Sequence, residues 1–200
     1  EDQGPVVILV AQKSELLDQA CESIEQIWPW RGQESGEPLQ VYRYWGGVTF
    51  DPELPQRPTL VVASSQQMIA RIEGGDPFAN VVLSRAHLVV LDEAHHALAA
   101  GHQRLIEAYE YARGPRETRT LGLTATPGRS NLVDANQSRQ LAALFGNVLI
   151  VPKVAERGGA LNWFQREGYL SRISQKTLDI DSQVAQTLGK LKKHEALEEQ

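Results

Sequence analysis

An α/β fold, with helices on both faces of a mostly parallel sheet, is the fold class that this sequence predicts. Short apolar runs rich in β-branched residues alternate along the chain with amphipathic helical patterns. Each intervening segment is long enough to be a crossover that returns the chain to the same edge, as parallel pairing requires. The composition, 42% hydrophobic and 22% charged over 200 residues, excludes a disordered tail, a collagen-like polymer and a coiled-coil rod.

The predicted strands are the unbroken apolar runs, which suit strands covered on both faces. Five runs separated by helical patterns are expected to form the sheet, and they cover 6–10, 60–63, 88–91, 120–123 and 148–151. A further short strand is expected around 41–45, inside a proline-rich excursion from 34 to 58.

The predicted helices follow these runs and carry apolar residues at a spacing of three and four. The first begins at Ser14, a good N-cap residue, and is expected to stop at Pro29. Further elements are expected in chain order: a helix at 66–72, a turn at 74–77, helices at 102–113 and 136–145, a helix at 161–167, a strand at 169–173 and a final helix.

Net charge and cysteine content argue against nucleic-acid binding by bulk charge and against a disulfide-linked protein. The chain carries 20 basic and 25 acidic side chains, a net charge of −5, so nucleic acid would have to be bound by a local groove rather than by bulk charge. The single cysteine, Cys21, excludes an intramolecular disulfide and is expected in the core. Because the chain has neither a long apolar run nor a basic leader, we expect a cytoplasmic protein with no membrane partner.

Polar residues follow four of the predicted strands, at the ends where parallel sheets bind their ligands. These segments are 12–14, 64–67, 92–96 and 124–127. The third contains two adjacent carboxylates, Asp92 and Glu93, which are costly to bury unless a cation or a polar network receives them. One could hold Mg²⁺ while the other polarises a water for attack on phosphate, or both could merely cap the following helix.

The motifs at these strand ends resemble those of superfamily two helicases and translocases. Residues 88–95, Leu-Val-Val-Leu-Asp-Glu-Ala-His, resemble motif II, the Walker B or DEAH box, and 121–127, with Thr-Ala-Thr-Pro, resemble motif III. Residues 7–19 are similar to motif Ia and 60–66 to motif Ib, and a glycine pair lies between them. The stretches 144–146 and 167–170 resemble the end of the first RecA-like domain in DEAH-type restriction and repair helicases.

This resemblance implies a three-layer RecA-like sheet of the P-loop NTPase type, in an ATP-dependent helicase or translocase with ATP and Mg²⁺ as cofactors. By resemblance, Asp92 would bind Mg²⁺ and Glu93 would orient the hydrolytic water. Coupling of the nucleotide state to the nucleic-acid groove would fall to His95, Thr124, Ala125 and Thr126. The sugar-phosphate backbone, of DNA in preference to RNA, would be contacted by Gln12, Lys13, Gly46, Gly47, Ser64 and Ser65.

The sequence departs from the family at the phosphate-binding loop. That loop requires Gly-x-x-x-x-Gly-Lys followed by Thr or Ser, and the nearest candidate, Gly189-Lys190, fails both flanking requirements. We therefore expect an N-terminally truncated domain, without arginine fingers, that hydrolyses little ATP on its own. Residues 1–158 would form the partial RecA-like domain, and 159–200 an extension towards a second RecA-like domain that the chain lacks.

Two other functions remain open on the residues alone. A non-catalytic module for nucleic-acid binding or scaffolding would keep the backbone contacts without a working nucleotide site. A zinc site could form from Asp92, His95 and His96 with His87 or His102, although adjacent histidines point apart on a helix.

The aromatic residues Tyr42, Tyr44 and Trp45 also allow two interpretations. They could stack on single-stranded bases. Alternation along the predicted strand explains the two tyrosines equally well, and it favours a place in the core or on the sheet surface.

Overall fold

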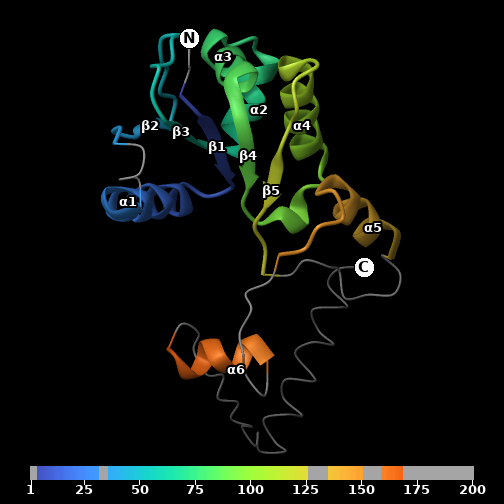
Figure 1. The fold of residues 1–200 in the computed structure, drawn as a ribbon. Coiled ribbons are helices and arrows are strands. Elements are labelled where there is room, and N and C mark those ends of the chain that lie inside the picture. The colour runs from blue at the N-terminus through green and yellow to red at the C-terminus, as the bar shows by residue number, and fades with distance from the viewer. Residues whose placement is uncertain (1–3, 32–35, 126–134, 151–158, 169–200) are drawn as a thin grey trace, which may run out of the picture. The chain divides into compact units, whose positions relative to one another are not determined.

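The computed structural model describes residues 4–31, 36–125, 135–150 and 159–168 of the chain (Figure 1). Thr126, the strand expected at 169–173 and the final helix lie outside these residues. The chain divides into two compact units, Glu1–Val148 and Leu149–Gln200. The first unit contains the sheet. In the second, the structure describes the helix α6 (Gly159–Arg166), which matches the helix expected at 161–167 within two residues at its start.

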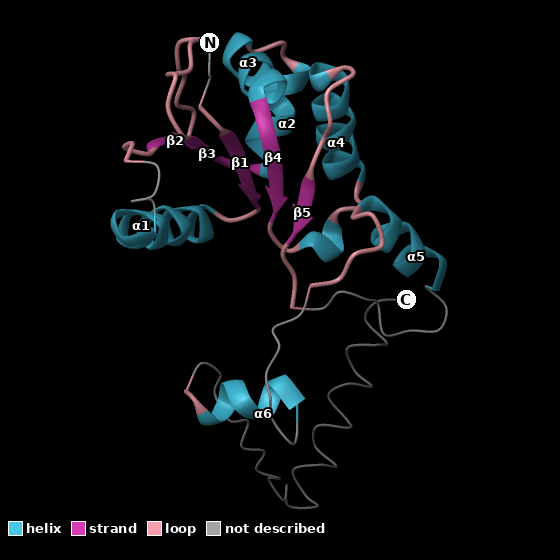
Figure 2. Ribbon diagram, viewed as in Figure 1, coloured by secondary structure: helices cyan, strands magenta, loops and turns pink. Residues whose placement is uncertain are grey.

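Five parallel strands form one sheet in the order β2-β3-β1-β4-β5 (Figure 2). Their bounds are β1 Val6–Ala11, β2 Gln40–Tyr44, β3 Thr59–Ser64, β4 Ala86–Leu91 and β5 Thr120–Gly122. Every pair is parallel, so all five carboxyl ends lie at one edge of the sheet. The predicted α/β class with a parallel sheet is confirmed.

The apolar run expected as a strand at 148–151 is not a strand at its described residues, and β2 supplies the fifth strand instead. Val148, Leu149 and Ile150 are 68%, 65% and 79% exposed, and none of the described strands pairs with them. Strand preference depends on packing against neighbouring strands, and β2 finds that neighbour in β3. The apolar character of 148–150 is therefore not enough to form a strand.

The helices of the first unit lie where the crossovers were expected, with two differences. They are α1 Ser14–Arg31, α2 Ser65–Glu73, α3 Pro77–Arg85, the single-turn helix η2 Ala94–His96, α4 Ala100–Arg113 and α5 Ala135–Leu144. Pro29 does not end α1, which continues to Arg31, so the N–H bond that the proline removes and the strain of its ring fall within the last turn of the helix. The turn predicted at 74–77 is present at Gly74 and Gly75, but it leads directly into an unpredicted helix, α3. The Asp76 side chain accepts from the Ala79 amide (3.0 Å), and Pro77 occupies the first helical position.

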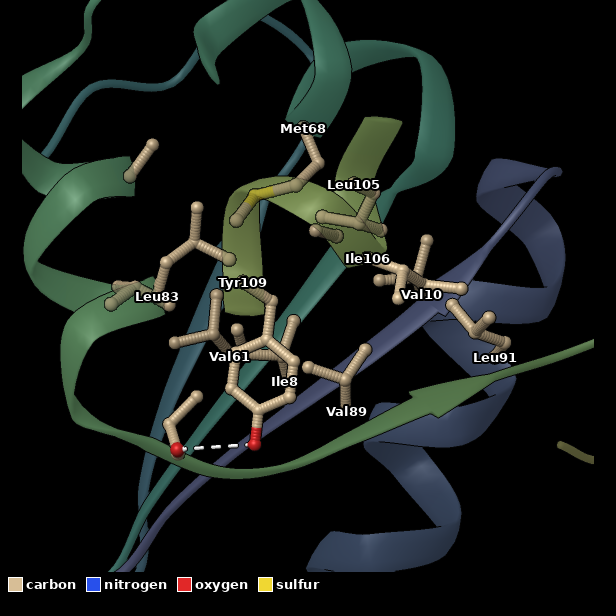
Figure 3. Close-up of a cluster of buried hydrophobic side chains, with 14 of the residues drawn as sticks. Ile8, Val10, Val61, Met68, Leu83, Val89, Leu91, Leu105, Ile106 and Tyr109 are labelled. Atoms are coloured by element: carbon tan, nitrogen blue, oxygen red, sulfur yellow. Dashed lines mark hydrogen bonds between the residues drawn. The ribbon is translucent and has the colours of Figure 1, made fainter. Parts of the chain in front are cut away.

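The larger core lies on the face of the sheet that α2, α3 and α4 cover (Figure 3). Tyr109 of α4 is fully buried there, and its hydroxyl donates to the backbone oxygen of Ala86 at 3.3 Å. The strands contribute their alternate residues to this core, which include Ile8, Val10, Val61, Val89 and Leu91.

The helix α1 packs on the opposite face against β1 and β3, where Leu17 and Cys21 are completely buried. The prediction that Cys21 is a core residue is therefore confirmed. Towards β5 this face is less covered, since Leu121 and Leu123 are 37% and 45% exposed. None of the described helices has the length and hydrophobicity to cross a membrane.

Candidate functional site

The turn that follows β4 is held between the ends of its two neighbouring strands. The Asp92 amide donates to the Val10 oxygen of β1, and the Leu123 amide donates to Leu91 of β4, both at 2.9 Å. The Ala94 amide then donates to the Leu123 oxygen, also at 2.9 Å. These bonds bring the carboxylates after β4 and the segment after β5 together at one edge, as the parallel topology requires.

Glu93 adopts a left-handed backbone conformation, with φ 49° and ψ 47°, which is uncommon for a residue with a side chain. Its side chain does not cap η2, and neither does any other. The alternative in which the acidic pair caps the next helix is therefore wrong for Glu93. Instead, its Oε2 lies 3.2 Å from Nδ1 of His95.

His95 joins the two loops of the site through the same ring nitrogen. Its Nδ1 lies 3.1 Å from the hydroxyl oxygen of Thr124, in addition to its contact with Glu93. A protonated Nδ1 donates to the Glu93 carboxylate, whereas an unprotonated one accepts from the Thr124 hydroxyl. One imidazole nitrogen therefore lies within hydrogen-bond distance of both the Glu93 carboxylate and the Thr124 hydroxyl. Ala125 follows in an exposed position.

Asp92 is half-buried and lines a cavity of about 250 Å³. Its neighbours in the cavity wall include Leu9, Ala11 and Leu123, so one charged group faces an otherwise mainly apolar lining. Within the described part of the chain, its carboxylate has neither a hydrogen bond nor an ion pair. Two uncommitted carboxylate oxygens fit Mg²⁺, which takes one or two protein carboxylates and completes its shell with water and phosphate.

The structure does not bring the suggested zinc ligands together. No group of three or more potential ligands of the His, Cys, Asp and Glu types gathers among the described residues. His87 lies at the opposite end of β4 from Asp92, and its Nδ1 accepts from the Val6 amide at 3.2 Å. His102 is buried in the first turn of α4, and this burial, with the charge of His96, lowers its pKa.

The residues expected to contact a sugar-phosphate backbone come from three strand ends. Gln12 and Lys13 are exposed after β1, and Gly46 and Gly47 are exposed after β2. The Ser64 oxygen accepts from the Gln67 amide at 3.2 Å and so caps α2. Ser65 is only 5% exposed, which leaves its side chain covered in this structure.

Two residues without a predicted role, Gln67 in the polar segment 64–67 and Arg71 beyond it, reach the glycine pair. The Gln67 Oε1 accepts from the Gly47 amide at 3.4 Å, and Arg71 donates to the Gly47 and Val48 oxygens at 3.4 and 3.1 Å. Their four-residue spacing, which places both on one face of α2, is the sole sequence signal for this role.

The tyrosines of β2 belong to the core. Tyr44 is fully buried, and its ring lies 5.2 Å from that of Phe78 and 6.1 Å from that of Phe50. Tyr42 contacts the same two rings, and burial raises its pKa. The core interpretation is confirmed, and neither ring is free to stack on a base.

Comparison with known proteins places these features in a family. The family model described as DEAD/DEAH box helicase matches residues 1–135. No curated protein matches the chain. Among solved structures, the helicase domain of Hef from Pyrococcus furiosus is similar, with a TM-score of 0.51 and 22% sequence identity over 72% of this chain. This chain spans 28% of the length of that one, and at such an identity the likeness shows the RecA-like helicase fold alone. Since the family model covers well over half of the residues, the chain belongs to the DEAD/DEAH box helicase family.

Proposed function

We propose that this chain acts in an ATP-dependent helicase or translocase, as the part of a RecA-like domain that links a Mg²⁺–ATP site to a nucleic-acid groove. The observation that carries the proposal is the single His95 nitrogen shared by Glu93 and Thr124. It connects the turn after β4, which carries the acidic pair, with the segment after β5. In this proposal residues 1–158 are the RecA-like part and 159–200 an extension towards a second such domain.

At the nucleotide side, Asp92 would hold Mg²⁺, because its oxygens are uncommitted beside the cavity. When bound, the ion neutralises charge on the ATP phosphates. Glu93 would orient the attacking water and accept its proton, since a half-exposed carboxylate beside an imidazole suits general base catalysis. A change in the protonation or contacts of Glu93 would then alter the hydrogen bond between His95 and Thr124, and so couple the nucleotide site to the nucleic-acid groove.

At the nucleic-acid side, the exposed Lys13 and the glycine pair would meet backbone phosphates, with Gln12 and Ser64 as further donors. A Ser64 hydroxyl that accepts from an amide can still donate its own hydrogen to a phosphate oxygen. Such contacts carry little sequence information, so we expect binding without sequence preference. DNA is proposed as the partner in preference to RNA.

The catalytic power of this chain alone is expected to be low. Its 200 residues contain no Gly-x-x-x-x-Gly-Lys-Thr or Gly-x-x-x-x-Gly-Lys-Ser segment, so the backbone amides and lysine that neutralise the β and γ phosphates are lacking. We expect ATP turnover by the chain at the background level. Turnover that Glu93→Gln abolishes would show this expectation to be wrong.

The groove is tested by the binding of fluorescent oligo(dT) and oligo(U) to the chain, measured by anisotropy at several salt concentrations. Lys13→Ala should weaken binding and reduce the slope of log K against log salt by about 0.7, the contribution of one phosphate contact on a single strand. Arg119→Gln is the matched control. It removes one charge from a side chain that is 67% exposed. Arg119 directly precedes β5, so it lies at the amino-terminal ends of the parallel strands, whereas the groove residues follow the carboxyl ends.

Binding that neither Lys13→Ala nor Ser64→Ala changes would refute the groove. Tighter binding of oligo(U) than of oligo(dT) would reverse the assigned preference for DNA. Oligonucleotide binding that added Mg²⁺–ATP leaves unchanged would favour the second candidate, a non-catalytic nucleic-acid-binding module, because background ATP turnover is expected of both candidates. That candidate is supported by the missing phosphate loop.

A further inference from the structure

The loop after β2 is held in place from α2. Arg71 donates through Nη2 to two successive backbone oxygens, those of Gly47 at 3.4 Å and Val48 at 3.1 Å. One turn earlier on the same helix, Gln67 accepts from the Gly47 amide at 3.4 Å. One face of α2 therefore binds the Gly47 amide and the backbone oxygens of Gly47 and Val48.

Arg71 is itself fixed by two further groups. Its Nη1 donates to Oδ2 of Asp76 at 2.7 Å, in a pair whose side chains are 23% and 16% exposed. Its guanidinium also lies 5.6 Å from the centre of the Tyr44 ring. Although burial opposes it, the hydrogen bonds from the Ala79 amide and from Arg71 lower the pKa of Asp76, so this carboxylate stays ionised at neutral pH.

The glycines do not fix the loop conformation by themselves. Gly46 and Gly47 have φ values of +69° and +81°, in the region that favours glycine. A Cβ at either position would meet nothing within 4 Å, so the outer side of the loop is open to a ligand. Two adjacent glycines are conformationally free in the absence of an anchor, and Arg71 is the side chain that bonds to two of the loop's carbonyl groups.

We propose that Arg71 is a positioning residue for nucleic-acid binding: it holds the Gly46–Gly47 loop in the conformation that receives a backbone phosphate. The proposal rests on the proposed function and names the group that prepares this part of the groove. The guanidinium donates inward to Asp76, Gly47 and Val48, and it does not contact the phosphate. Its loss raises the free energy of ordering the loop when the strand binds.

The test compares Arg71→Gln with the unchanged chain in the same oligo(dT) anisotropy titration. We expect binding to weaken by about fivefold to tenfold, the range expected when one or two groups must be ordered on binding. The salt slope should stay unchanged, because a phosphate contact would contribute about 0.7 to it. Arg104→Gln is the matched control, since Arg104 is an exposed partner of Glu73 and, among the described residues, forms neither a hydrogen bond nor an ion pair with the loop.

A second variant separates positioning from charge. Asp76→Asn leaves a side chain that can still cap α3, and it makes the chain less negative, yet it weakens the hold on Arg71. We expect it to bind oligo(dT) more weakly despite the gain in net charge. Hydrogen exchange of residues 45–50 without nucleic acid should be faster in both variants. If Arg71→Gln fails to fold, Arg71→Lys keeps the charge without the planar fork, and it should show the same weakening.

The outcomes distinguish this proposal from the one on which it rests. If Lys13→Ala weakens binding and Arg71→Gln does not, the groove stands and the positioning role is overturned. A salt slope that falls in Arg71→Gln would make Arg71 a direct phosphate contact, which also overturns it. If the unchanged chain binds neither oligonucleotide, the proposed function fails and the role of Arg71 fails with it.

Discussion

A methyl group added at Gly122 should push apart the two loops that form the candidate site. Gly122 ends β5, directly before the residue that binds the Ala94 amide. A Cβ there would lie 2.7 Å from the Ala94 Cβ and 2.7 Å from Cζ of Phe145. Carbon atoms in contact normally lie about 3.5–4.0 Å apart, so each approach is too close by about 1 Å.

The two neighbours differ in how they can respond. The Phe145 contact is at the far end of a side chain, so its ring can tilt away. The Ala94 Cβ is attached directly to the turn between Glu93 and His95, so relief requires this turn to move. Overpacking by one carbon costs about 1–3 kcal/mol, and the loss of glycine flexibility in the unfolded chain offsets about 0.5–1 kcal/mol. Two approaches of 2.7 Å put the overpacking cost in the upper part of its range, so we expect Gly122→Ala to lower the free energy of unfolding by about 1–2 kcal/mol.

Urea denaturation followed by circular dichroism measures this change. With a slope of about 2 kcal/mol per M, the midpoint should fall by about 0.5–1 M. The companion variant Ala94→Gly removes the stiff neighbour. The double variant should therefore be more stable than the two single effects predict, by about 1 kcal/mol of coupling.

Two results would show that this reasoning is wrong. One is Gly122→Ala with the stability of the unchanged chain, which would mean that the contact relaxes without cost. The other is a double variant whose stability change equals the sum of those of Gly122→Ala and Ala94→Gly. Any loss of stability in Gly122→Ala would then come from a contact other than the one with Ala94. Either would remove the evidence for tight packing between the two loops.

Three further predictions concern individual side chains. Burial lowers the pKa of His102, and burial with the charge of Arg113 lowers that of His87, so the unfolded chain binds protons at these sites at a higher pH than the folded one. The free energy of unfolding should therefore fall as the pH drops through about 6.5, which urea titrations at pH 7.5 and 5.5 measure. The fall should be smaller in the double variant His87→Gln/His102→Gln. An equal fall in that variant would show that these two histidines do not cause the pH dependence. Tyr109→Phe should cost about 1–3 kcal/mol in thermal or urea unfolding, because the Ala86 oxygen and the Arg119 amide both lose a partner, while Tyr111→Phe on the same helix, 90% exposed, should cost under about 0.5 kcal/mol. The Cys21 thiol, whose pKa is raised by burial, should react with an aromatic disulfide reagent far more slowly in the folded chain than in urea, and equal rates would place it at the surface.

The sequence by itself determined the fold class and most of the sheet. The strands β1, β3, β4 and β5 and the short strand at 40–44 were predictable because each carries its own apolar run, bounded by residues that stop it. The meeting of Asp92 and Glu93 with Thr124 was also predictable, since the carboxyl ends of parallel strands share one edge. The family resemblance rested on the same motifs.

Only the tertiary structure decided how the ends of these strands are held. The exposed run at 148–150, the helix that passes through Pro29 and the helix that begins at Pro77 each carry local signals that are ambiguous without their neighbours. The anchor at Arg71 left even less trace, because its partners Gly47 and Val48 lie 24 and 23 residues away along the chain. A guanidinium donates to whichever carbonyl groups lie within hydrogen-bond distance. The packing of α2 on the sheet decides which groups these are, and no local sequence pattern encodes that packing.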